Sequence, residues 1–556
     1  MSELAPALRR LQKRLEEAGW ESEETHISLV LLGGDEVWKI KKPVALGFLD
    51  FSTLERRRAA CAAEVRLNRR LTTDVYLGVE PITRRGDELR LGGGSTNDPE
   101  GEPGGEAAEE VAGSGGEVVE WAVHMRRVPR AARADVLLGA GRFGHAEIEH
   151  VARALAAFHA EARADLETAR FGDVAVVEGN VRENFRQVAP FLLRYLQPAQ
   201  AGELRQWQLD FLARNRALLE RRAERDRVRD GHGDLRLDHV YFEGAHRERL
   251  SILDCIEFND RFRFADVCAD LAFLAMDLAA HGRVDLAEAL LARYAEASDD
   301  FDLFALVDFY ESYRAFVRGK ILGMMIRSAD GHDRVVERSA REARRYFRLA
   351  LACGKRPLLP PRLIAVGGSL ATGKSTISRA FGVRLSSPVI SADATRKAML
   401  GIEPDTHQDD APFSGAYRPE VTEEVYRELR RRAQVVVASG RSVILDASFR
   451  SRIERAAARS LAESMGVPFL FVECRAAHEV VEARLRERRA AGVSSVSDGR
   501  LEILDELLAS WDSISGEEED CVIRVDTTAA GPEGLASLWE LLPRWPDPPA
   551  AGSVAR

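Results

Sequence analysis

The sequence predicts a multidomain protein in which an α+β part is followed by an α/β part. The chain has 556 residues, which is too long for one hydrophobic core. β-Hairpin signals and long helical patterns fill its first two thirds, whereas strands and helices alternate after residue 362, as in a parallel sheet. We therefore expect domains at 1–352 and 362–545, a linker at 353–361 and a disordered tail at 546–556.

Composition narrows the class of protein. Apolar residues make up 45% and charged residues 30%, which is typical of globular proteins, and no stretch is long and apolar enough to span a membrane. The formal charge of −10 does not favour nucleic acid as a partner, although it is compatible with a local basic groove. The 6 cysteines form no CxxC pair and the N-terminus has no signal-peptide core, so we expect a cytoplasmic protein of unknown oligomeric state.

The α+β part begins with a sheet and a helix. Its first twenty residues read as an amphipathic helix. In order, we then expect a hairpin at 26–41, a helix at about 53–71, strands at 75–83, 86–91 and 117–126, and a flexible Gly/Glu-rich loop at 92–116. From Ala146 the pattern is mostly helical to about Cys353, interrupted by one hairpin at 239–254.

The surest motif opens the α/β part. A GxxxxGKS sequence lies between the apolar run LIAV and the helical run STISRAF, the context that a P-loop requires. Its backbone N–H groups surround phosphate oxygens, Lys374 places a charge on the β- and γ-phosphates, and Ser375 offers a hydroxyl to Mg²⁺. The nucleotide-binding candidates are Gly368, Ser369, Leu370, Ala371, Thr372, Gly373, Lys374, Ser375 and Thr376.

Two aspartates follow later strands of the same part. Asp393 comes after PVIS, where it is either a general base for an attacking hydroxyl or simply a helix cap. Arg396 and Lys397 follow on the next turn and are candidates to hold an anionic or polyhydroxy substrate. Asp446 ends SVILD and is a Walker-B-like acid for Mg²⁺.

An arginine-rich helix at 477–490 follows the strand PFLFVEC. It carries Arg484, Arg486, Arg488 and Arg489, at least two of which we expect on a solvated face. One or two others, with Arg484 and Arg488 as candidates, are expected to close over the phosphates as a lid.

These parts together resemble the P-loop kinases that phosphorylate small molecules or polynucleotide 5′-hydroxyls, namely the gluconate-kinase-like, zeta-toxin-like and polynucleotide-kinase-like groups. The resemblance covers about 362–545 and includes the P-loop, Asp393 and Arg396. It implies an ATP-dependent kinase in which Asp393 is the catalytic base.

A second site is predicted in the α+β part. His232-Gly233-Asp234-Leu235 precedes the 239–254 hairpin and Asp254 ends it, so an antiparallel return brings Asp234 and Asp254 together. One carboxylate orients a hydroxyl and the other holds Mg²⁺, unless both only cap loops. Lys39 lies in a strand and Glu64 on the following helix, where the two can form an ion pair beside ATP phosphates.

HGDLRLDHVYF and ILDCIEF resemble the catalytic loop and the metal-binding segment of the aminoglycoside phosphotransferase and choline kinase group, and ADLAFLAMDL resembles its DLA helix. The resemblance covers about 26–350 and implies a two-lobed protein-kinase-like fold. It implies that Asp234 is the catalytic base, Asp254 a Mg²⁺ ligand, Lys39 the ATP lysine and Glu64 its partner, with Asp270 bracing the catalytic loop. Alternation places Lys41 on the same strand face as Lys39. We prefer Lys39 as the ATP lysine because it lies within the strand, whereas Lys41 lies at its end.

The sequence departs from that group at one position, because His239 stands where the family has an Asn that binds metal. Imidazole is a poor Mg²⁺ ligand beside oxygen donors. Either His239 or Asp238 takes the place of the Asn, or the second metal position is lost.

The whole chain resembles bacterial proteins that fuse such a phosphotransferase-like domain to a P-loop kinase. We expect two kinase-type domains that use ATP and Mg²⁺ to phosphorylate a hydroxyl of a small molecule, such as a sugar, an aminoglycoside-like compound or a nucleoside. The alternatives are a polynucleotide 5′-hydroxyl kinase, and a P-loop kinase regulated by a catalytically weak N-terminal nucleotide-binding domain.

Overall fold

In this computed structural model the chain forms two compact units. Unit 1 comprises Met1–Gly144, Phe158–Gly179 and Asn215–Leu274, and unit 2 comprises His145–Ala157, Asn180–Arg214 and Ala275–Arg556. The structure describes residues 4–25, 27–46, 49–86, 88–92, 117–328, 334–355, 357–403, 406, 414–491, 510–514, 516–528, 539–540 and 542–545. This division follows contacts between segments, so the boundary expected at 353–361 stays a prediction.

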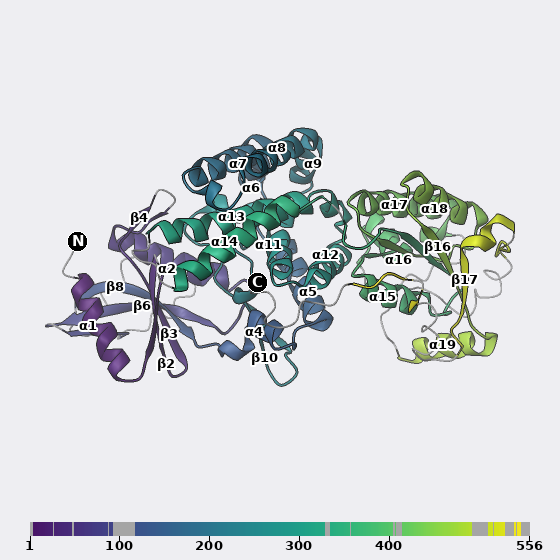
Figure 1. Ribbon diagram of the computed structural model, residues 1–556. Helices are drawn as coiled ribbons and strands as arrows, with labels where there is room; N and C mark the ends of the chain where they lie inside the picture. The colour runs from purple at the N-terminus through teal and green to yellow at the C-terminus, as the bar shows by residue number, and fades with distance from the viewer. Residues whose placement is uncertain are drawn as a thin grey trace. The chain divides into compact units, whose positions relative to one another are not determined.

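Unit 1 begins with a helix and an antiparallel sheet (Figure 1). Among the described residues the sheet has six strands in the order β1-β2-β3-β8-β6-β7. The strands are β1 (Glu21–Glu24), β2 (Ser28–Gly33), β3 (Glu36–Lys41), β6 (Tyr76–Arg85), β7 (Glu88–Leu91) and β8 (Glu117–Arg126), and the helices are α1 (Leu4–Glu17) and α2 (Leu54–Asn68).

The two faces of this sheet bury different helices. Leu29 and Leu31 of β2 pack with Leu11 of α1, whereas Val37 of β3 packs with Cys61 of α2. Successive side chains of a strand point to opposite faces, so Lys39 and Lys41 lie on the face that α2 covers. The predicted ion pair between this strand and helix is therefore sterically available.

Two small antiparallel pairs build the rest of the first site. β10 (Val240–Glu243) pairs with β11 (Arg249–Ile252), and Val240 lies opposite Ile252. β9 (Val228–Asp230) pairs with β12 (Phe264–Asp266). The segment before β10 and the segment after β11 therefore leave the hairpin at the same end, which brings Asp234 and Asp254 into one space, as expected.

Helices make up most of the chain between residues 134 and 352. They are α4 (Ala134–Gly139), α5 (His145–Glu161), α6 (Leu166–Ala169), α7 (Val174–Val188), α8 (Pro198–Arg214), α9 (Arg216–Glu224), α10 (Asp260–Arg263), α11 (Val267–Ala280), α12 (Val284–Ser298), α13 (Val307–Ser328) and α14 (Arg334–Ala352). Short strands β4 (Ala45–Leu46) and β5 (Leu49–Asp50) pair in unit 1.

Unit 2 contains a parallel sheet of five strands among its described residues, in the order β14-β15-β13-β16-β17. The strands are β13 (Leu363–Gly367), β14 (Val389–Ser391), β15 (Val443–Asp446), β16 (Phe469–Arg475) and β17 (Val522–Asp526). The helices of this region are α15 (Lys374–Leu385), α16 (Ala392–Met399), α17 (Pro419–Ala438), α18 (Arg452–Ser464) and α19 (His478–Ala491).

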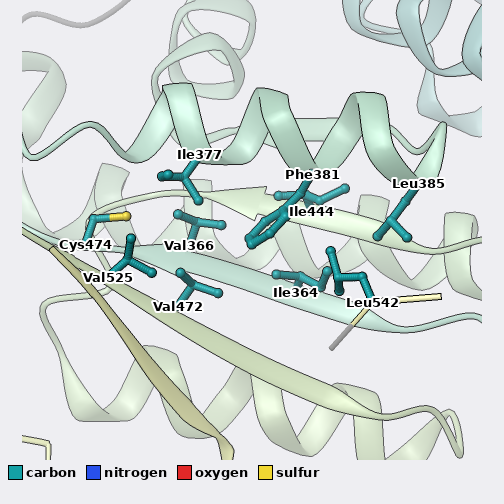
Figure 2. Close-up of a cluster of buried hydrophobic side chains, with 10 residues drawn as sticks. All are labelled: Ile364, Val366, Ile377, Phe381, Leu385, Ile444, Val472, Cys474, Val525 and Leu542. Atoms are coloured by element: carbon teal, nitrogen blue, oxygen red, sulfur yellow. The ribbon is translucent and has the colours of Figure 1, made fainter. Parts of the chain in front are cut away.

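One helix face and the central strands form the core of this sheet. In Figure 2, Ile377, Phe381 and Leu385 of α15 point from the helix toward the strands. They meet Val366 of β13 and Ile444 of β15, all buried. A spacing of four residues places three apolar side chains on one helix face, and their burial fixes the helix N-terminus beside the end of β13.

The predicted fold class is confirmed. Strands β13 to β16 lie where the alternating pattern places them. β17 was missed, because a short apolar run in a polar surrounding carries little signal. Apart from Gly92, the loop expected at 92–116 lies outside the described residues, as does the tail at 546–556.

Candidate functional sites

The P-loop of unit 2 depends on two glycines with left-handed backbone. Gly368 has φ of +143° and Gly373 has φ of +82°, conformations that other residues rarely adopt. A Cβ on Gly368 would lie 2.4 Å from the backbone oxygen of Cys474 in β16. The loop therefore turns sharply between β13 and α15 and leaves the N-terminus of α15 open toward the turn, which favours an anion.

Side chains from distant segments support the loop. The Lys374 Nζ donates to the Ser369 backbone oxygen at 2.7 Å. Arg484 of α19 donates to the oxygen of Ala371 at 3.1 Å and to that of Thr527 at 2.6 Å. Thr527, after β17, donates through its hydroxyl to the Thr372 oxygen at 2.7 Å. Arg484 thus lies at the nucleotide loop and bonds to its backbone.

Asp446 lies at the carboxyl end of β15, directly beside the P-loop strand. Parallel pairing places it opposite Val366 on one side and Ser391 on the other. Burial raises the pKa of the carboxyl, while Lys374 and the Ser375 hydroxyl act in the opposite direction. Among the described residues its buried Oδ1 has no hydrogen-bond partner. An orphaned carboxylate oxygen at this position needs a cation or a water.

Ser375 and Asp446 therefore fit a Mg²⁺ ion that accompanies a nucleotide. They offer one hydroxyl and one carboxylate oxygen, the hard ligands that Mg²⁺ prefers, and bound phosphates supply the rest in such sites. Within the described ranges no group of three or more His, Cys, Asp and Glu side chains is arranged to hold a metal by itself.

Asp393 is not the cap of its helix. Ser391 occupies that position, because its Oγ accepts a hydrogen bond from the Ala394 N–H at 3.4 Å. The Asp393 carboxylate instead accepts from Arg396 Nη1 at 3.1 Å, and the Arg396 guanidinium lies over the Tyr417 ring at 4.4 Å. The charge of Asp393 also raises the pKa of Asp446, so the two carboxylates interact electrostatically.

In unit 1 the predicted lysine joins two carboxylates. Lys39 Nζ donates to Glu64 Oε1 at 2.8 Å and to Asp254 Oδ1 at 2.6 Å. Burial opposes its charge, but Asp254 and Glu64 outweigh that effect and raise the pKa of Lys39 well above its ordinary value. Lys39, Glu64 and Asp254 thus form one charged cluster between β3, α2 and the end of the β10–β11 hairpin.

A second lysine completes the cluster. Lys41 is fully buried and donates to Glu64 and Glu257. Burial opposes ionisation of Glu64, yet Lys39 and Lys41 lower its pKa below the ordinary value. Lys41 therefore binds one carboxylate oxygen of Glu64, while Lys39 binds the other and also contacts Asp254. Sequence reasoning missed Glu257, although it lies in the ILDCIEF segment.

The expected catalytic loop is braced by Asp270. Its carboxylate accepts the backbone N–H of His232 at 2.6 Å and that of Gly233 at 2.9 Å. His232 donates through Nε2 to the Leu253 oxygen at 2.9 Å. These bonds fix the backbone on either side of Asp234 and Asp254 and hold both aspartates at the same end of the hairpin.

His239 does not fit a Mg²⁺ ion. Its Nδ1 lies 2.8 Å from the Asp234 backbone oxygen, so Nδ1 carries the proton. Its Nε2 accepts from Arg236 Nη2 at 2.9 Å. The lone pair that a metal needs is thus engaged by a cation.

Of the candidate lid arginines, the structure describes only some side chains. Arg484 is placed at the P-loop, and Arg486 pairs with Glu482 on the exposed face of α19 at 2.9 Å. Arg488 and Arg489 have side chains outside the described residues. Thr527 and Tyr417 were missed, because neither lies in a motif.

Comparison with known proteins assigns the family. Residues 363–513 match the family model described as "AAA domain". Over 490 residues the chain is 31% identical to the "Uncharacterized protein Rv2004c" of Mycobacterium tuberculosis, covering 88% of this chain and 90% of the relative. The chain belongs to the family of this mycobacterial protein. A Mycobacterium bovis member, "Uncharacterized protein Mb2027c", has the same identity and coverage.

Solved kinase structures align with each part. A gluconokinase from Sinorhizobium meliloti is 22% identical, with 33% of this chain and 96% of that chain covered and a TM-score of 0.24. A choline/ethanolamine kinase family protein from Mesorhizobium loti is 13% identical, with 61% and 88% covered and a TM-score of 0.30. The expected resemblance to both kinase groups is found among these structures. Likeness at this level identifies no acceptor.

No helix in the described part of the chain combines the length and the apolar character that crossing a membrane requires.

Proposed function

We propose that the P-loop region of unit 2 transfers the γ-phosphoryl group of ATP to a hydroxyl of a small molecule. One observation carries this proposal: Asp393 follows β14, whose neighbour β15 ends in Asp446 and pairs with the P-loop strand β13, and Asp393 is not used as a helix cap. A carboxylate in this position can accept the proton of an attacking hydroxyl. A cytoplasmic location, where ATP is available, is part of the proposal.

Each residue has a distinct role in this account. The loop N–H groups and Lys374 bind the phosphates, and Ser375 and Asp446 would hold Mg²⁺, which neutralises phosphate charge when bound. Arg396, held flat against Tyr417, orients Asp393 and presents a cation to the acceptor side. Arg484 stabilises the loop conformation by donating to the backbone oxygen of Ala371.

The role of Asp393 is tested by Asp393→Asn. Loss of a positioned general base lowers the transfer rate by about 10²- to 10⁴-fold, whereas nucleotide affinity should stay the same because Lys374 and the loop are untouched. The matched control is Asp520→Asn, at an exposed position. An Asp393→Asn variant that transfers phosphate as fast as the control would refute the assignment.

We also propose that unit 1 binds a nucleotide. This rests on Lys39, which contacts both Glu64 and Asp254 within one cluster. Lys39→Met should remove one of the nucleotide-binding sites seen by calorimetry. The control is Lys42→Met, at the residue that follows β3, which should retain both sites. Retention of both sites in Lys39→Met would count against a nucleotide site in unit 1.

A further inference from the structure

Arg236 lies at the centre of the polar groups of unit 1. Its Nε is 3.3 Å from each carboxylate oxygen of Asp234, and its Nη1 donates to Asp238 Oδ2 at 2.8 Å. Its Nη2 donates to His239 Nε2 at 2.9 Å. One guanidinium therefore touches the candidate base, a second carboxylate and the residue expected to hold a metal.

The imidazole of His239 lies beside both this guanidinium and Asp254. Its Nε2 lies 3.6 Å from Asp254 Oδ2, while the other oxygen of Asp254 accepts from Lys39 at 2.6 Å. Lys39 thus contacts Asp254, and Arg236 contacts Asp234. A divalent ion beside His239 would meet a fixed positive charge instead of a lone pair.

From this arrangement we infer that unit 1 binds the phosphates of a nucleotide without a divalent cation, and that Arg236 supplies the positive charge there. A guanidinium offers several N–H donors in a fixed plane and matches phosphate oxygens in pairs. Lys39, bound to Asp254, adds a point charge. The ligand class is a nucleoside di- or triphosphate, whose anionic groups replace carboxylates as partners of the two cations.

The same contacts make unit 1 a weak catalyst. The Asp234 carboxylate already lies against the Arg236 guanidinium, so an acceptor hydroxyl would have to displace this contact to reach it. Unit 1 then binds the nucleotide without transferring its phosphoryl group. This inference rests on the nucleotide site proposed for unit 1 and does not depend on transfer at the P-loop.

The test uses the full chain with Lys374→Ala, which weakens the P-loop site. Binding of a non-hydrolysable ATP analogue is measured by calorimetry in EDTA and in Mg²⁺. The expected result is one site whose dissociation constant differs by less than about threefold between the two conditions. Lys374→Ala with Lys39→Met sets the baseline, and inorganic triphosphate in place of the analogue shows whether the nucleoside contributes.

Arg236→Gln in the same background is the decisive variant. Binding in EDTA should weaken by about tenfold or more, because a charge-assisted pair is lost. Binding in Mg²⁺ should weaken less, since the freed Asp234 and Asp238 can then attract the ion. Arg221→Gln, on the exposed face of α9, is the matched control and should change neither value.

Arg236→Lys keeps the charge and covers the case in which Arg236→Gln does not fold. It should retain metal-free binding within about tenfold of the parent. The inference is overturned if the parent loses the analogue in EDTA, or if Arg236→Gln binds like the control in both conditions. Failure of phosphate transfer by the unmodified chain would refute the proposed kinase activity and leave this result unaffected.

Discussion

Glu64 is the residue on which the charged cluster of unit 1 depends. It is fully buried and accepts hydrogen bonds from both Lys39 and Lys41. Its partners could be predicted in part from the sequence, because strand alternation places both lysines on one face and α2 crosses that face. Glu257 could not, because its contact with Lys41 joins positions 216 residues apart through tertiary packing.

Glu64→Gln should destabilise unit 1 strongly. The change leaves two lysines short of a compensating charge in a buried site, which costs about 3–5 kcal/mol. Denaturant unfolding measures the effect, with Glu55→Gln on the exposed side of the same helix as control. Equal midpoints for the two variants would show that the buried pair contributes nothing.

His232 gives unit 1 an acid-sensitive position. Burial lowers the pKa of its imidazole from the ordinary 6.5 to about 4, and it lies fully buried against the Leu253 oxygen. The unfolded chain therefore binds a proton at His232 more readily than the folded one. Its contribution to stability is present above about pH 6.5 and is lost as the pH falls toward about 4.

Lowering the pH across that window should thus cost on the order of 3 kcal/mol at this residue. His232→Gln, whose amide can still donate to the Leu253 oxygen, should flatten the decline. Thermal unfolding between about pH 7 and pH 4 measures both chains. Parallel curves would mean that another group governs the acid response.

At the scale of elements, the P-loop was predictable because its glycines, lysine and flanking strand and helix are contiguous in sequence. The contacts that support the loop could not be predicted from the sequence. Thr527 follows β17, and Arg484 reaches the loop from α19, more than a hundred residues after Ala371. Contacts of this kind depend on strand order, which the sequence does not encode locally.

Gly368→Ala tests the geometry of the loop. A Cβ there would lie 2.4 Å from the Cys474 oxygen and 2.7 Å from Thr372 Oγ1, at a φ of +143°. We expect a loss of about 1–3 kcal/mol of stability and at least tenfold weaker nucleotide binding. Gly202→Ala, where the structure shows open space on α8, should stabilise by up to about 1 kcal/mol. Normal nucleotide binding by Gly368→Ala would contradict the loop conformation.

At the scale of the whole molecule, charge bears on the acceptor class. The formal charge of −10 provides no general attraction for a polynucleotide, whereas a small hydroxyl compound needs none. A 5′-hydroxyl oligonucleotide should therefore remain unlabelled by γ-labelled ATP at both low and high salt. Labelling that declines as salt rises would instead identify a polynucleotide kinase with a local basic groove.

The sequence predicts two kinase-type regions and ranks turnover by the first below turnover by the second, because His239 stands where the family has an Asn. The structure separates them by chemistry: Asp446 retains an orphaned oxygen beside Ser375, whereas in unit 1 His239 accepts from Arg236 and Asp254 accepts from Lys39. The ranking depends on side chains that meet through folding, and a single residue type such as His239 only hints at it.

The most direct test of the account is a screen of γ-phosphoryl transfer from ATP to sugars, aminoglycosides and nucleosides, using the unmodified chain, Asp393→Ala and Asp234→Ala. We predict a phosphorylated product that disappears in Asp393→Ala and persists in Asp234→Ala. A product that is lost in Asp234→Ala and retained in Asp393→Ala would contradict the assignment of phosphoryl transfer to the P-loop region.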